Sequence, residues 1–118
     1  MTWFKNELLV AAKTVIIFIH HPILKVDTWV DKEFSLSNRE AIKELLLLYN
    51  QEVIIFCGHY HTEDETVNNN IKQYITPAAS YQILKGTDQL KVDINIFGYR
   101  LIYINDGQIN TEVILHNK

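Results

Sequence analysis

The apolar residues of the chain follow a helical spacing or form short unbroken runs in the first half, and alternate with polar residues in the second half. Near the N-terminus, Phe4 and Leu8 lie about one helical turn apart, and alanines extend the same face, which predicts a helix over residues 3–12. The runs Thr14–Ile19 and Val53–Cys57 are rich in β-branched residues. They predict two strands that are covered on both faces.

A second helix is predicted between these two strands. Ser37 and Glu40 have the spacing of a capping box, in which two side chains bind free backbone N–H groups at a helix start. The apolar stripe that follows consists of Ile42, Leu45, Leu46 and Tyr49. A helix that begins near Asn38 would join the two strands in a strand, helix, strand unit with a parallel sheet.

Turn residues divide the second half into two β-hairpins. The run Asn68–Asn70 tolerates a left-handed backbone, which predicts a tight turn between arms at 65–67 and 71–76. The pair Asp106-Gly107 is typical of a type I′ turn, here between alternating segments at 99–104 and 109–115. The predicted fold class is therefore α/β over residues 1–61 and antiparallel β over 62–118, which makes the chain as a whole α+β.

Composition narrows the class of protein. A chain of 118 residues with 47% hydrophobic content can bury one modest core, so it is one domain or part of one. The net charge of -3 gives no basic field for nucleic acid or anionic lipid, and no apolar run approaches a membrane span. The single cysteine forms no internal disulfide, and we expect a cytoplasmic location.

Three histidines directly follow the two predicted strands. His20 comes after the first strand, and His59 and His61 come after the second, in the sequence Gly58-His59-Tyr60-His61. A helical crossover places the C-terminal ends of both strands at one sheet edge, where open α/β sheets bind ligands. Imidazole is a common ligand for zinc, iron and manganese. We therefore expect these three histidines to bind metal, with His59 and His61 diverging toward two neighbouring ions.

Other polar side chains near these motifs are expected to have structural or surface roles. His21 adjoins Pro22, which fixes the turn, so we expect it to support the site without binding metal. We expect His116 to lie on the surface and Cys57 to be a small buried hydrophobe within its strand. The loop carboxylates that we expect to be solvated are Asp27, Asp31, Glu63 and Asp64.

Two motifs resemble those of a known family. The strand that ends in His20-His21-Pro22 is similar to the strand-His-x-Pro motif of calcineurin-like metallophosphoesterases, and Gly58-His59-Tyr60-His61 is similar to their Gly-His-x-His motif. The segment Gly98–Ile102 ahead of Asp106-Gly107 resembles the closing hairpin of the bacterial cyclic-nucleotide phosphodiesterase-like branch. Trp3-Phe4 resembles the helix before the first motif, so the resemblance covers nearly the whole chain.

The resemblance implies the C-terminal half of a metallophosphoesterase-type β-sandwich flanked by helices. It also implies two divalent metals (manganese, iron or zinc) at the sheet edge, with His20 and His59 on one and His61 on the other. In such enzymes a metal-activated hydroxide attacks the phosphorus of a phosphate ester or cyclic nucleotide. No further catalytic residue carries over to this chain.

The family also has Asp-x-His, Gly-Asp and Gly-Asn-His motifs, which do not occur here. The resemblance thus implies a single partial domain over 1–118, which we expect to be inactive alone and to bind at most one metal, weakly. Because a two-stranded parallel sheet with two apolar faces needs a cover, we also expect a homodimer. The alternatives are a catalytically silent fragment that self-associates or serves as a binding module, and a single zinc held by all three histidines.

Overall fold

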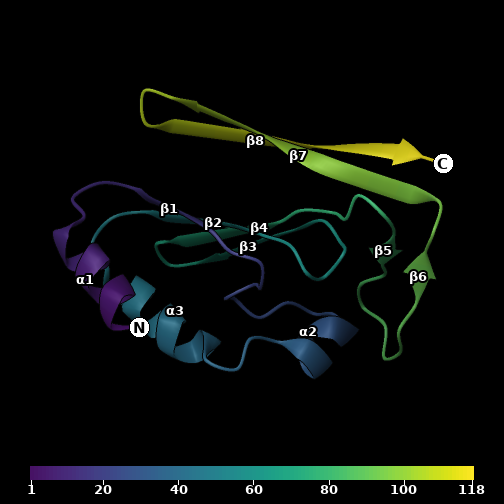
Figure 1. Cartoon of the computed structure of the whole chain (residues 1–118), viewed down its shortest axis with the longest axis horizontal. Coiled ribbons are helices and arrows are strands. Elements are labelled where there is room, and N and C mark those ends of the chain that lie inside the picture. The colour runs from purple at the N-terminus through teal and green to yellow at the C-terminus, as the bar shows by residue number, and fades with distance from the viewer.

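A four-stranded sheet lies at the centre of the chain in a computed structural model that describes residues 1–118 (Figure 1). Its strand order is β1-β2-β4-β3. The second strand in this order pairs parallel with both neighbours, whereas β3 and β4 form an antiparallel hairpin. The bounds of the strands are β1 Val15–Phe18, β2 Val53–Cys57, β3 Asp64–Asn68 and β4 Ile71–Ile75.

Helices cover one face of this sheet and a long hairpin covers the other (Figure 1). The helices are α1 Thr2–Val10, α2 Trp29–Phe34 and α3 Arg39–Leu48. The hairpin consists of β7 Ile96–Asn105 and β8 Gln108–Asn117, and the short pair β5 Gln82–Ile83 and β6 Val92–Asp93 precedes it. The predicted α+β class is confirmed. None of the helices is long and apolar enough to cross a membrane.

The core lies between the helices and the sheet, with β2 at its centre. All five residues of β2 are buried, as the apolar run predicts. The core cluster contains Val53, Ile55 and Cys57 from β2, together with β4 and the loop after β1. Phe56, which alternates with these residues along the strand, stacks instead on Phe18 and Tyr74 of the neighbouring strands.

The long hairpin is attached to the sheet at two points. The Arg100 guanidinium donates hydrogen bonds to the Thr76 hydroxyl (3.2 Å) and the Ile75 carbonyl (3.1 Å), and lies 5.0 Å from the centre of the Tyr74 ring. The Gly98 N–H donates to the Ala78 carbonyl at 2.9 Å. The hairpin therefore docks through Arg100 and Gly98, and the Gln82 side chain adds a hydrogen bond to the Ile96 carbonyl at 3.2 Å.

Several predicted elements are confirmed and others are wrong in detail. The first helix, α3, β1, β2 and both hairpins lie where the pattern predicts them, and Asn69, Asp106 and Gly107 have the left-handed backbone expected in their turns. The capping box is wrong, because the cap residue of α3 is Asn38 and it makes no side-chain hydrogen bond. The apolar pattern also misses α2, which begins at a Thr28 cap.

The prediction that the first strand is covered on both faces is also wrong. Strand β1 forms one edge of the sheet, none of its residues is buried, and Phe18 is 67% exposed. An apolar run shows that a strand can be buried, but the burial itself needs neighbours on both sides.

Candidate functional site

Two loops leave the C-terminal ends of β1 and β2 side by side. The backbone ladder continues past both strands, because the Ile19 N–H donates to the Phe56 carbonyl at 3.1 Å and the Gly58 N–H donates to the His20 carbonyl at 3.0 Å. The parallel crossover thus brings the two histidine motifs together at one sheet edge, as the sequence predicts.

Three imidazole rings cluster at this edge. The ring centres of His20 and His59 are 4.9 Å apart, and His21 lies 4.3 Å from His59 and 5.1 Å from His20. The Nε2 atom of His59 is buried and has no hydrogen-bond partner. A buried polar nitrogen without a partner is unfavourable, so this atom is suited to binding a ligand. A metal ion fits that requirement.

The third predicted ligand is turned elsewhere. The Nδ1 atom of His61 lies 3.1 Å from the Tyr81 carbonyl oxygen, and its ring lies 4.6 Å from the Tyr81 ring. No group of three or more His, Cys, Asp or Glu side chains is arranged to hold one metal ion. The arrangement therefore does not support a single zinc held by all three histidines. It offers a pair of imidazoles, His20 and His59, with His61 two residues along the same loop.

His21 lies within the cluster although the sequence suggested only a supporting role. Its ring is closer to His59 than that of His20 is, so proximity does not favour His20 as the partner of His59. His116 lies on the exposed surface of β8, as expected, where it stacks on Phe97 at 5.2 Å.

The environment of His59 favours its neutral form. Burial of the ring is the main cause that lowers its pKa, and His21 comes next. The Phe34 backbone opposes them, and His20 and His61 lower the pKa by smaller amounts. Neutral imidazole is the form that coordinates metal. At neutral pH this side chain is therefore ready to act as a ligand without first losing a proton.

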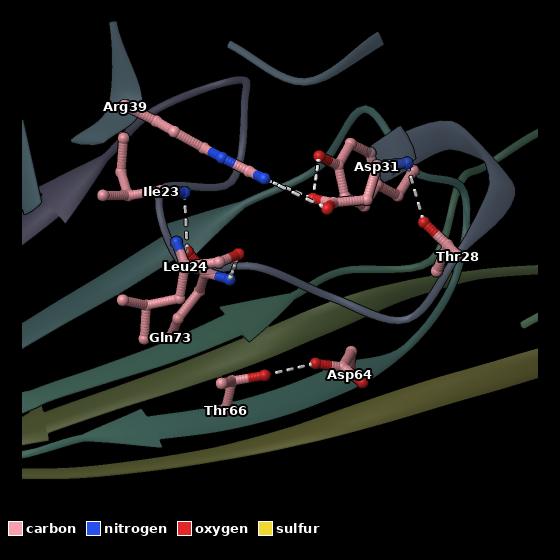
Figure 2. A network of polar contacts seen from close by, with 9 residues as sticks. Ile23, Leu24, Thr28, Asp31, Arg39, Asp64, Thr66 and Gln73 are labelled. Atoms are coloured by element: carbon pink, nitrogen blue, oxygen red, sulfur yellow. Dashed lines mark hydrogen bonds and ion pairs between the residues drawn. The ribbon is translucent and has the colours of Figure 1, made fainter. Parts of the chain in front are cut away.

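A buried amide holds the loop that follows His20-His21-Pro22. The Gln73 side chain on β4 accepts the N–H groups of Ile23 (2.7 Å) and Leu24 (2.8 Å) and donates to the Leu24 carbonyl at 3.2 Å (Figure 2). It is completely buried. The motifs along the chain do not point to Gln73, although a polar residue at an inward position of an alternating strand is a usable signal.

One of the loop carboxylates expected to be solvated is buried. Asp31 is 2% exposed and forms an ion pair with Arg39 (Figure 2). It lies in α2, a short helix that the apolar pattern does not predict, and that helix places its side chain inward. Asp27 and Glu63 are exposed as expected, and Asp64 is partly buried and contacts Lys85.

Curated proteins similar to this chain are bacterial phosphodiesterases. A probable cyclic nucleotide phosphodiesterase of Psychrobacter arcticus is 30% identical over 110 residues, which cover 91% of this chain and 39% of that protein. The chain is a partial homologue of bacterial cyclic nucleotide phosphodiesterases. The resemblance to a part of a metallophosphoesterase of this branch is thereby confirmed.

Other cyclic nucleotide phosphodiesterases match in the same way. The 3',5'-cyclic adenosine monophosphate phosphodiesterase CpdA of Escherichia coli is 26% identical over 116 residues, which cover 96% of this chain and 42% of that protein. The chain spans between 35% and 43% of the length of curated relatives of this kind. No protein-family model matches it. The solved structure of Vacuolar Protein Sorting 29 from Cryptosporidium parvum covers 74% of this chain and 47% of that one at 15% identity, but its TM-score of 0.30 is too low to carry an argument.

Proposed function

We propose that this chain is the C-terminal part of a dinuclear metal-dependent phosphodiesterase, which hydrolyses phosphodiesters such as cyclic nucleotides once the rest of the domain is present. The observation that carries the proposal is the buried Nε2 of His59, which has no partner and whose ring adjoins that of His20. This atom lies in a chain related to cyclic nucleotide phosphodiesterases.

The metal ligands in this proposal are His20 and His59 for one ion and His61 for the other. The ions are manganese, iron or zinc, all of which accept imidazole. When bound, such a pair of ions would activate a water molecule and neutralise charge on the phosphoryl oxygens. The chain's own residues would hold the ions in place, since the Tyr81 carbonyl orients the His61 ring through Nδ1 and leaves Nε2 for a metal.

The proposal also holds that the chain is inactive by itself. Two cations a few ångströms apart repel strongly unless anionic ligands lie between them. No carboxylate joins the histidine cluster in an arrangement that could hold a metal. His20 and His59 would then bind a single ion weakly, with open positions filled by water.

The surface beside β1 supports completion by further protein. A groove of about 580 Å³ is lined by twelve hydrophobic residues and Glu7, which come mainly from α1 and β1. The free edge of β1 borders it, and Trp3 and Phe18 are 72% and 67% exposed. An apolar groove next to an unpaired strand is suited to a segment that adds a strand and covers both elements.

A fusion protein tests this proposal. The chain would be joined to the remaining N-terminal part of a relative such as the E. coli enzyme, and hydrolysis of cyclic adenosine monophosphate would be measured with added manganese. We expect turnover by the fusion and none by the chain alone. We also expect His59→Ala to abolish turnover by the fusion, whereas His116→Ala, the matched surface control, leaves it intact. Turnover by the unfused chain that is lost in His59→Ala, and so does not come from a contaminating phosphatase, would contradict the proposal, as would a fusion that keeps its turnover in His59→Ala.

The same apolar groove favours one alternative. A second copy of the chain could cover the groove, which would make the chain a self-associating module without catalytic activity. This is the homodimer expected from the sequence. Failure of every fusion to gain activity, combined with a stable dimer, would favour this alternative.

A further inference from the structure

We propose that Tyr60, Asp31 and Arg39 form a positioning network that sets the directions of His59 and His61 for metal binding. This inference rests on the proposed function of the two histidines as ligands. The network joins the loop after β2 to α2 and α3. Its tyrosine, Tyr60, occupies the x position of the Gly-His-x-His motif, where the motif specifies no residue.

Tyr60 is the anchor of the histidine loop. It is completely buried, although the histidines on both sides are only partly buried, and its ring belongs to the core cluster. Its hydroxyl donates a hydrogen bond to Oδ1 of Asp31 at 2.6 Å. A carboxylate only accepts hydrogen bonds, so the phenolic hydroxyl is the donor in this contact.

Asp31 is itself held from two other directions. Arg39 binds both carboxylate oxygens, with Nη1 to Oδ1 at 2.5 Å and Nη2 to Oδ2 at 3.2 Å. The Thr28 hydroxyl accepts the Asp31 N–H at 2.9 Å and thereby caps α2 (Figure 2). Because a bidentate Arg–carboxylate pair is planar and directional, the oxygen that receives the Tyr60 hydroxyl has a defined position.

The backbone on both sides of Tyr60 explains why such an anchor is needed. His59 and His61 have φ angles of 69° and 51°, which place two histidines in the left-handed region that non-glycine residues seldom adopt. Such conformations persist only when the surroundings hold them. The Tyr60 N–H donates to the Gly58 carbonyl at 2.8 Å, and the His61 carbonyl accepts the Ile83 N–H at 2.7 Å. The hydroxyl contact to Asp31 adds the one side-chain constraint between the two histidines.

We expect the network to affect the orientation of the His59 and His61 side chains more than the stability of the fold. A buried ion pair contributes little net stability compared with apolar residues of similar size, but breaking it leaves charge uncompensated. Hydrogen bonds around metal ligands orient them, and their loss lowers metal affinity by about 10-fold to 100-fold. We therefore expect the Tyr60 hydroxyl to act on metal affinity and on the local loop more than on the whole fold.

The test compares Tyr60→Phe with Tyr103→Phe in the full chain. Tyr103 is a matched control, because its hydroxyl also donates to a carboxylate, that of Glu112 at 2.9 Å, but on the exposed hairpin. Zinc affinity would be measured by calorimetry, and hydrogen exchange would be measured at the Ile83 and Gly58 amides. We expect Tyr60→Phe to lower zinc affinity by about 10-fold and to speed exchange at these two amides. The control should change neither.

Two outcomes would overturn the inference. One is unchanged affinity and exchange in Tyr60→Phe. The other is a uniform rise in exchange at all amides with affinity reduced only in proportion to unfolding, which would mean a purely structural role. If Tyr60→Phe does not fold, Arg39→Lys probes the far end of the network and should speed exchange at the same two amides. If the parent chain binds no zinc, the proposed ligand function fails, and exchange alone decides whether the network holds the loop.

Discussion

At the scale of single residues, burial changes the acid–base chemistry of two side chains beside the candidate site. The Cys57 thiol is buried in β2 and donates weakly to the Tyr74 carbonyl at 3.4 Å. Burial raises its pKa to about 12, so it is neither a thiolate nor a ready metal ligand at neutral pH. In His59 burial acts in the opposite direction, because the charged form of imidazole is the protonated one.

The lowered pKa of His59 predicts how stability depends on pH. Below the unfolded-state value of about 6.5, the unfolded chain binds a proton that the folded chain resists. We therefore expect the free energy of unfolding of the metal-free chain to fall as pH decreases from 7 to 5. Urea unfolding in the presence of a chelator measures this. The pH dependence should be weaker in His59→Gln, while His116→Gln serves as the control. If the free energy of unfolding changes with pH equally in the parent chain and in His59→Gln, the lowered pKa of His59 is contradicted.

The residues of the candidate site differ in how well sequence predicts them. His20 and His59 are predictable because both follow strands whose ends must meet at one edge. Asp31 and Tyr60 are not, because their partners are 8 and 29 residues away from Asp31 and come from different elements. A local pattern carries no information about contacts that exist only after α2 and α3 have packed.

At the scale of elements, aromatic residues connect the three parallel strands. Phe18, Phe56 and Tyr74 occupy matching register positions on β1, β2 and β4. Their rings stack with centroids 5.5 Å and 5.3 Å apart, and Arg100 of the hairpin closes the far end of the row over Tyr74. The row thus links the exposed edge strand to the docking point of β7.

Close packing at Gly98 predicts that the hairpin tolerates no side chain there. A Cβ atom would lie 2.7 Å from the Ile114 carbonyl oxygen and 2.8 Å from Leu115 Cδ2. We expect Gly98→Ala to lower the free energy of unfolding by roughly 1–3 kcal/mol, as overpacking does elsewhere. Urea denaturation measures this, and Gly58→Ala is the matched control because nothing lies within 4 Å of its added atom. Equal stabilities of the two variants would show that β8 shifts at no cost to make room for the added atom.

Helices and strands can be predicted from the sequence where the segment itself carries a recognisable turn or apolar pattern. The hairpin β7–β8 follows from its Asp106-Gly107 turn, and β2 from its run of β-branched residues. Helix α2 has only six residues, too few for an apolar period to be recognised. The apolar run of β1 by itself predicts a buried strand. Its exposure follows only from the sheet's need for a cover, because burial of a strand depends on its neighbours.

At the scale of the whole molecule, the chain is more open than a self-contained domain of its size. Its radius of gyration is 15.1 Å, whereas a compact domain of this length has about 13.5 Å. Its accessible surface is 7405 Å², against about 6,600 Å² expected for a folded monomer of this mass. Helix α1 contributes to this surface, because none of its residues is buried and Trp3, Leu9 and Val10 are exposed.

This surface predicts that the isolated chain self-associates through α1 and β1. Exposed apolar side chains gain about 1.5–3 kcal/mol each when they are buried, and a two-fold contact lets one patch cover its copy. We expect sedimentation at micromolar concentration to show a dimer. Phe18→Lys should yield a monomer, whereas Val67→Lys, at an equally exposed apolar position on β3, should not. A folded monomer of the parent chain would contradict this prediction.

The two rims of the central sheet have opposite chemistry. The outer strand β3 carries polar and acidic residues and ends the sheet, because charge at a rim discourages further pairing. Strand β1 at the other rim is apolar throughout, which suits it to pairing with a further strand. The sheet is therefore better suited to extension beside β1 than beside β3. A strand added beside β1 would move the histidine cluster from the margin of the sheet to its middle, where the surrounding loops can enclose it.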